Sequence, residues 1–172
     1  MSLIAVTVIG HDRPGIIADA TAGLAALGLN LEDSTMTLLR GHFAMMLICA
    51  GESSPEQVEH ALEPLTAGGS LTVSARTVPD EDASAATGRP YILTVHGGDR
   101  PGIVSALTRI VAESGGNITD LTTRLSGELY LVIAEVDLPA DADVDALTTQ
   151  LSQTGAELGV DVSLRVQETD VL

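Results

Sequence analysis

Aromatic residues are nearly absent from this sequence: two Tyr, one Phe and no Trp make up 2% of its 172 residues. Proteins that hold bases commonly stack them on aromatic side chains, so a site of that kind is not expected. Lysine is absent too, and the eight basic residues are all arginine. Against 24 acidic residues they leave a formal net charge of −16. Direct nucleic-acid binding is therefore not expected, because affinity for phosphate backbones comes largely from cations.

Cysteine is almost missing as well, since Cys49 is the only one. A lone cysteine excludes an intramolecular disulfide and a cysteine-based metal cluster, and its apolar surroundings predict a buried small hydrophobe. The start of the chain lacks the basic region of a signal peptide, and no apolar run reaches the roughly 20 residues of a membrane helix. We expect a cytoplasmic protein that has no membrane partner.

An internal repeat is the main feature that is present. A shift of 87 positions places the run Asp12 to Ile16 on the run Asp99 to Ile103, both reading Asp-Arg-Pro-Gly-Ile. The same shift places Gly28 on Gly115 and Asn30 on Asn117. Between the copies lies an acidic segment bounded by prolines, which is typical of an exposed linker. We therefore predict two domains, residues 1–78 and 91–172, joined by a linker at residues 79–90.

Each copy shows the same order of expected elements. A β-rich run is followed by apolar residues at helical spacing from the proline onward, then by two strands joined at a tight hairpin. A second helix and a closing strand follow; in the first copy this helix begins at Ser54-Pro55-Glu56-Gln57, the pattern of a capping box. The order βαββαβ, twice, predicts an α+β protein of two ferredoxin-like modules, each with an antiparallel four-stranded sheet and both helices on one face.

The Asp-Arg-Pro-Gly motif stands where a strand ends and a helix begins. Unpaired backbone N–H groups and the helix dipole at such a place favour a carboxylate or phosphate, and a glycine lets the ligand approach the backbone. Asp12 and Asp99 are expected either to cap the helix or to accept hydrogen bonds from an ammonium group. A cap and turn without any ligand is the structural alternative.

Asn30 and Asn117 open the next strand, just after the glycine that ends the helix. An amide both donates and accepts hydrogen bonds and so suits a zwitterion. In this topology the asparagine need not lie beside the loop of its own module, but it can face the loop of a neighbouring module. We therefore predict that one amino acid is held between two modules, by backbone amides from one and an asparagine from the other.

These motifs in this order resemble the ACT domain, over nearly the whole chain. A chain of two ACT domains is similar to the family of glycine cleavage system transcriptional repressors. The resemblance implies a regulatory protein, not an enzyme, that binds a small amino acid, with glycine or serine as first candidates. It implies a homodimer that acts through a protein partner, in transcriptional control of glycine or one-carbon metabolism. The ligand-binding positions that it implies are His11, Asp12, Arg13, Pro14, Gly15, Asn30, Gly98, Asp99, Arg100, Pro101, Gly102 and Asn117.

Other functions are less well supported by the residues. The histidines lack the i, i+4 spacing of helical metal ligands, and no nucleophile elbow, phosphate loop or dinucleotide fingerprint occurs. We expect no catalytic residue, no metal and no cofactor. Two alternatives stay open: a regulatory subunit that acts on an amino-acid metabolic enzyme in trans, and a dimerisation module without a ligand. His11 in the first copy is replaced by Gly98 in the second, so the two sites are not expected to be equivalent.

Overall fold

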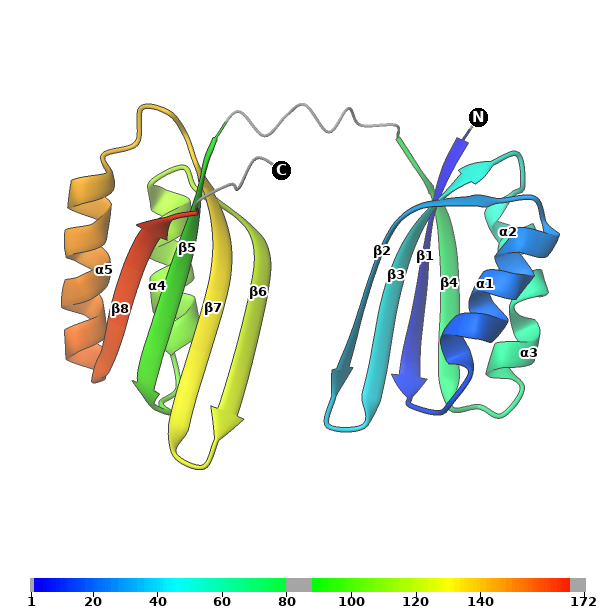
Figure 1. The fold of residues 1–172 in the computed structure, drawn as a ribbon, viewed down its shortest axis with the longest axis horizontal. Coiled ribbons are helices and arrows are strands. Elements are labelled where there is room, and N and C mark those ends of the chain that lie inside the picture. The colour runs from blue at the N-terminus through cyan, green and yellow to red at the C-terminus, as the bar shows by residue number, and fades with distance from the viewer. Residues whose placement is uncertain (1, 80–87, 168–172) are drawn as a thin grey trace. The chain divides into compact units, whose positions relative to one another are not determined.

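Each copy of the repeat folds into its own four-stranded antiparallel sheet with helices on one face (Figure 1). The computed structural model describes residues 2–79 and 88–167. The chain divides into two units, Met1–Asp82 and Ala83–Leu172, and each unit has a hydrophobic core of its own. Most of the predicted linker lies outside the described residues, and the first strand of the second module already begins at Arg89.

The two modules have matching element orders, which confirms the predicted fold. The first contains β1 (Ser2–His11), α1 (Ile16–Ala26), β2 (Asn30–Leu39), β3 (His42–Gly51), α2 (Pro55–Ala61), α3 (Glu63–Thr66) and β4 (Leu71–Val78). The second contains β5 (Arg89–Gly98), α4 (Ile103–Glu113), β6 (Asn117–Ser126), β7 (Leu129–Leu138), α5 (Val144–Leu158) and β8 (Val160–Val166). The strand orders are β2-β3-β1-β4 and β6-β7-β5-β8, so the edge strands are β2 and β4 in one sheet and β6 and β8 in the other.

The shift found in the sequence is also a structural shift. The first four elements of the second module begin and end 87 residues after those of the first, as β1 and β5 show. A bulge in β2 between Leu31 and Asp33 recurs in β6 between Ile118 and Asp120. The first halves of the modules are therefore copies down to local irregularities.

The second helical region of the first module differs from the single predicted helix. It is divided into α2 and α3, with Leu62 between them. Pro64 explains the break, because proline lacks an N–H and its ring clashes with the carbonyl four residues earlier. The corresponding α5 of the second module, which contains no proline, runs unbroken for 15 residues.

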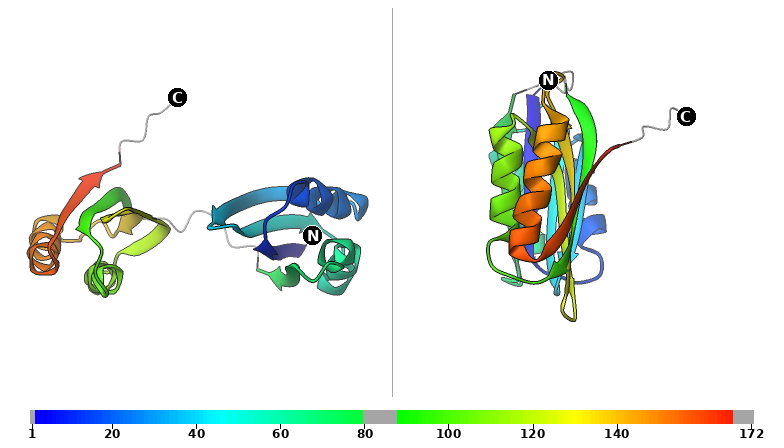
Figure 2. Two further views of the ribbon diagram at one scale, coloured as in Figure 1. Left: turned by 90° about the horizontal axis from the view of Figure 1, so that it is seen from below. Right: turned by 90° about the vertical axis from the view of Figure 1, so that its left-hand side faces the viewer.

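Within each module the helices lie against one face of the sheet, as the two views in Figure 2 show. Alternate residues of the central strands, such as Val6 and Leu47, point to the helices and are almost fully buried. Their neighbours point to the other face, where Ile9 and Met46 remain exposed. No helix among the described residues is long and apolar enough to cross a membrane.

Candidate functional site

The first loop, Asp12 to Gly15, connects β1 to α1 and is fixed by the strands beside it. The N–H of Asp12 donates to the carbonyl of Gly41 at 3.0 Å, and the N–H of His11 donates to that of Ser70 at 2.9 Å. Gly15 is the N-cap of α1, with a left-handed φ of 89° and no side-chain cap. Such a conformation favours glycine and leaves the amides of the first helical turn without a side-chain acceptor.

This loop agrees with one sequence expectation and corrects another. The helix begins at Ile16, so Pro14 lies just before its first turn, as expected. Because the N-cap in each module is a glycine without a side-chain hydrogen bond, neither Asp12 nor Asp99 caps its helix. The other predicted role, accepting hydrogen bonds from an ammonium group, stays a prediction.

The second loop, Asp99 to Gly102, has the same backbone form. Gly102 is the N-cap of α4, with φ 97° and no side-chain cap. The carbonyl of Gly102 accepts a hydrogen bond from a side-chain hydroxyl, since Ser105 Oγ donates to it at 3.0 Å. No such bond to the carbonyl of Gly15 is found among the described residues. Both loops therefore present helix N-termini, as the sequence predicts.

The arginines of the two loops take different places. Arg13 Nη2 forms an ion pair with Asp19 Oδ2 at 3.2 Å, and Arg13 Nη1 donates to the carbonyl of Pro14 at 3.1 Å. Arg100 instead lies against Gly159, close enough that an added Cβ there would be 3.3 Å from its guanidinium carbon. The sequence analysis did not predict that Asp19 pairs with Arg13. The position of Asp19, an acidic residue a few positions after the loop, could have indicated this ion pair.

The histidines near the loops also differ between the modules. The rings of His11 and His42 lie 6.1 Å apart in a perpendicular arrangement, because β1 and β3 pair at these residues. In the second module His96 Nε2 lies 3.4 Å from Asp161 Oδ2, on the exposed face of the sheet. Within residues 2–79 and 88–167, no three His, Cys, Asp or Glu side chains are grouped to hold a metal ion.

The asparagines lie at the end of each sheet opposite to the loop. Asn30 pairs with Ala50, whereas His11, which leads into the first loop, pairs with His42. The two pairs lie eight residue steps apart along β3, or about 27 Å at the rise of an antiparallel strand. Asn117, paired with Asp137, is related to the second loop in the same way. A module therefore does not bring its own asparagine and its own loop into one site.

Two hollows in the surface of the described residues lie away from the loops. One of about 520 Å³ in the second module is bordered by Gly115, Pro139 and Asp143, between the end of α4 and the start of α5. Another of about 540 Å³ in the first module is bordered by Leu3 and Ile48 and by residues 76–79 at the end of β4. Neither is lined by residues of the two Asp-Arg-Pro-Gly loops.

Cys49 lies in the core of the first module and is fully buried, as predicted. Burial raises the pKa of its thiol, and the nearby Glu32 carboxylate raises it further. The thiol therefore stays protonated near neutral pH and is a poor nucleophile.

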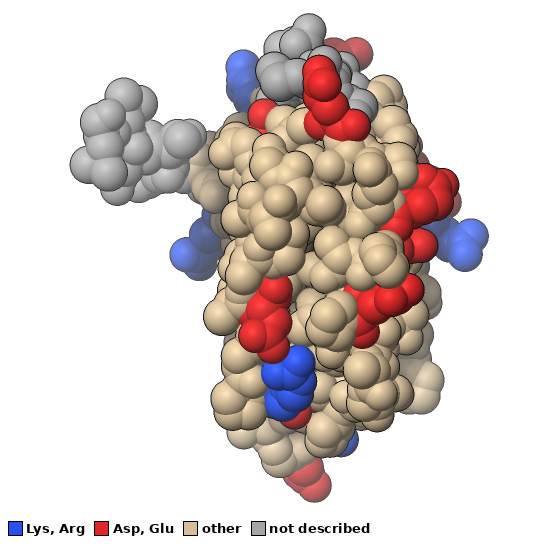
Figure 3. Space-filling view, turned by 90° about the vertical axis from the view of Figure 1, so that its right-hand side faces the viewer, with Lys and Arg blue, Asp and Glu red and all other residues tan. Residues whose placement is uncertain are grey.

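Figure 3 shows acidic side chains scattered over the helical side of the first module, with no basic patch in that view.

Comparisons with known proteins agree with the fold. The model of the ACT domain family matches residues 2–75 and 89–165. A UPF0237 protein of Methanopyrus kandleri is 42% identical over 81 residues, which cover 46% of this chain and 88% of that protein. A UPF0237 protein of Methanococcus maripaludis is 32% identical over 75 residues, covering 43% and 83%. Each of these relatives thus corresponds to about one module.

Solved structures match both modules together. The crystal structure of an unknown protein from Galdieria sulphuraria has a TM-score of 0.80 and 30% identity, covering 97% of this chain and 99% of that one. A crystal structure described as a glycine cleavage system transcriptional repressor has a TM-score of 0.72 and covers 98% of both chains. Its identity is 17%, so this second likeness concerns the fold alone.

Proposed function

This chain belongs to the ACT domain family, with two ACT modules in tandem, and from that premise we propose that it is a regulatory protein without catalytic activity that binds a small amino acid. The observation that carries the proposal is the repeated pair of features: a helix N-terminus behind an exposed glycine, and an asparagine at the far end of the same sheet. A ligand contacted by both features must therefore lie between two ACT modules.

The chemistry of these features fits a zwitterion. The amides at the starts of α1 and α4 would receive the carboxylate, which the helix dipole also favours. The carboxylates of Asp12 and Asp99 and the side-chain oxygens of Asn30 and Asn117 would accept from the ammonium group. Glycine and serine are the first candidates because the fold resembles that of a glycine cleavage system transcriptional repressor.

The protein would transmit the presence of its ligand to a protein partner. A net charge of −16 opposes direct DNA binding, so transcriptional control of glycine or one-carbon metabolism would need a partner that binds the DNA. We propose a homodimer for the active form. Affinity purification from cell extract with and without the ligand should recover this DNA-binding partner. Recovery of an amino-acid metabolic enzyme instead would favour regulation of that enzyme in trans.

A thermal-shift screen of the twenty amino acids tests the ligand. An amino acid at 100 times its dissociation constant should stabilise the folded protein by about 2.7 kcal/mol. Asn30→Ala and Asn117→Ala should each weaken binding at one class of site about tenfold or more, because a charge-assisted hydrogen bond is lost. Ser34→Ala, on the same exposed strand as Asn30 but paired with the core residue Leu47, is the control and should bind as the wild type does. If no amino acid shifts the midpoint, a dimerisation module without ligand becomes the better explanation.

A further inference from the structure

The sheet face that carries no helices is apolar in the first module. We call it the open face; it is formed at its centre by alternate residues of β1 and β3, whose neighbours Val6 and Leu47 point to the core. Ile9 and Met46 are 55% and 39% exposed on it. The residues at its centre are Leu3, Thr7, Ile9, Ala44, Met46 and Ile48.

Charged side chains occur only at the margins of this face among the described residues. The central strands β1 and β3 contain no Asp, Glu, Lys or Arg. Asp33 on edge strand β2 pairs with Ile48, and Arg76 on edge strand β4 pairs with Ala5. Since Ala5 also pairs with Ile48, the two charges stand at opposite ends of one row across the sheet. The ion pairs found among residues 2–79 and 88–167 include neither of them.

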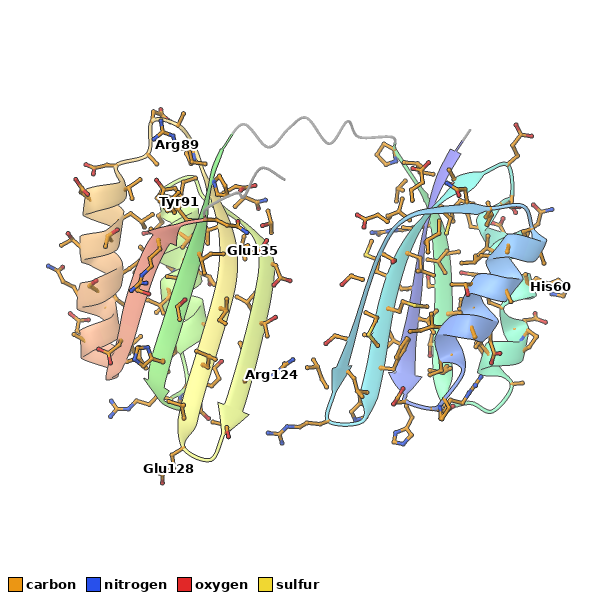
Figure 4. The ribbon with its side chains drawn as sticks, viewed as in Figure 1. His60, Arg89, Tyr91, Arg124, Glu128 and Glu135 are labelled. Atoms are coloured by element: carbon orange, nitrogen blue, oxygen red, sulfur yellow. The ribbon has the colours of Figure 1, made fainter. Side chains whose placement is uncertain are left out.

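The corresponding face of the second module is different in character. The residues 87 positions after Ile9 and Ile48 are His96 and Glu135, and His96 pairs with Asp161. Glu135 lies on the central strand β7, and Arg124 lies on the neighbouring edge strand β6 (Figure 4). Burying the carboxylate of Glu135 against an apolar surface would be costly. Of the two open faces, only that of the first module can therefore be covered without burying a charge at its centre.

We propose that the open face of the first module is the homodimer interface, packed against the same face of a second copy of the chain. A two-fold axis parallel to the strands, lying between two sheets about 10 Å apart, places Asp33 of each copy opposite Arg76 of the other. The centre of the interface is then apolar and its two margins carry complementary charges, which is the usual anatomy of a specific interface.

The size of the face is sufficient for such a dimer. Four strands spaced by about 4.8 Å and eight residues long cover roughly 19 by 27 Å, or about 500 Å² in projection. Side-chain relief makes the accessible area larger than this projection, and a standard interface buries about 800 Å² per partner. Exposed apolar patches of roughly 300–600 Å² are the largest on typical monomers and are often functional.

This inference names the surface for the homodimer of the proposed function, but it requires no amino acid. The two-fold axis brings like ends of the two sheets together, so it does not itself bring a loop to an asparagine. The oligomeric state is measured without ligand, and ligand binding is measured by thermal shift. A failure of one proposal is thus distinguishable from a failure of the other.

Sedimentation velocity of the full chain over a concentration series tests the interface, with circular dichroism to show that each variant is folded. Met46→Glu should raise the dimer dissociation constant about 100-fold or more, because each dimer then buries two carboxylates without partners. Ile133→Glu is the matched control, 87 residues later and similarly exposed at 40%, and it should leave the dimer intact. The proposal would be overturned if the wild-type protein sedimented as a monomer. It would also be overturned if Met46→Glu and Ile133→Glu raised the dimer dissociation constant equally.

A charge exchange gives a test that leaves the centre of the face unchanged. Asp33→Arg alone and Arg76→Asp alone place like charges opposite each other, and each should weaken the dimer about tenfold. The double variant restores opposite charges and should recover the wild-type dissociation constant. Additive weakening in the double variant would show that Asp33 and Arg76 do not face each other, and would refute the two-fold arrangement.

Discussion

The arginines of the two loops are held by different neighbours, although the loops have the same sequence. Asp19 lies in the first turn of α1 and binds Arg13, whereas the residue 87 positions later is Ala106. Arg100 lies instead near Gly159, at the C-terminal end of α5, where the helix dipole favours a cation. At the proposed sites, a carboxylate would therefore meet an arginine paired with Asp19 at the first loop, and at the second an arginine that forms no ion pair within the described residues.

Asp19→Ala should strengthen binding of the amino acid at the first loop several-fold. The substitution removes a negative charge from the helix N-terminus and releases Arg13 to contact the ligand carboxylate. The folded state should lose less than about 1 kcal/mol, since both side chains of the pair are exposed. Isothermal titration calorimetry measures the affinity, with Asp145→Ala in α5 as the control. Unchanged affinity would show that Arg13 takes no part in binding.

Gly10→Ala should destabilise the first module by about 1–3 kcal/mol. A Cβ at Gly10 would overlap the carbonyl oxygen of Ser70, which accepts the hydrogen bond that fixes the first loop. Gly98→Ala is the control because a Cβ there has no atom within 4 Å, and it should be nearly neutral. Urea denaturation followed by circular dichroism compares the two. Equal stabilities would mean that β1 and the chain before β4 are not as close as the geometry indicates.

At the scale of single elements, the start of α2 illustrates a local sequence pattern that determines structure. The Ser54 N–H donates to the Gln57 side chain at 2.8 Å, and the Gln57 N–H donates to Ser54 Oγ at 3.3 Å. These reciprocal bonds confirm the predicted capping box. Ser54→Ala should cost about 1 kcal/mol of stability, and Ser54→Gly only a few tenths. Thermal unfolding distinguishes the two; equal losses would argue against a contribution from the cap.

The same cap gives a pH dependence. Hydrogen bonding to Ser54 lowers the pKa of the Glu56 carboxyl below its ordinary value of 4.5, and a further bond to the Glu56 backbone adds to this. When folding lowers the pKa of a carboxyl, that carboxyl stabilises the folded state at any pH above its pKa in the unfolded chain. This stabilisation is lost as the pH falls through the lower pKa of the folded state. The stability difference between wild type and Ser54→Ala should therefore decrease as the pH falls below 4.5. A difference that is constant with pH would contradict a role for Glu56.

Elements with a local signal could be predicted from the sequence, and those that depend on register could not. The bounds of β2 follow from Asn30 after a helix-ending glycine and from the turn at Arg40, whose φ of 51° is left-handed. Pro64 was a local signal for the break after α2 that the apolar periodicity concealed. The contact of His11 with His42 depends on the pairing of β1 with β3, which the sequence alone does not fix.

At the scale of the whole molecule, the two modules have diverged unequally. Their first four elements match in bounds, including the bulge, but the second helical region is divided in one module and unbroken in the other, and single residues of the open face differ in charge. The loops and asparagines proposed for the ligand lie in the first halves. The residues proposed for the dimer differ between the copies at Ile48 and its counterpart Glu135. This divergence fits a division of roles in which both modules bind ligand and one forms the dimer.

Separate cores predict that damage to one module stays within it. Leu62 and Leu151, which lie at corresponding places in the two modules, are each 1% exposed and each belong to one core cluster. Leu62→Ala and Leu151→Ala should each cost about 2–5 kcal/mol, because a buried side chain is replaced by a cavity. Hydrogen exchange read by mass spectrometry should show lost protection at residues 2–79 for the first variant and at residues 88–167 for the second. Lost protection across both modules in either variant would mean that they unfold as one cooperative unit, and that the cores alone do not account for the stability of each module.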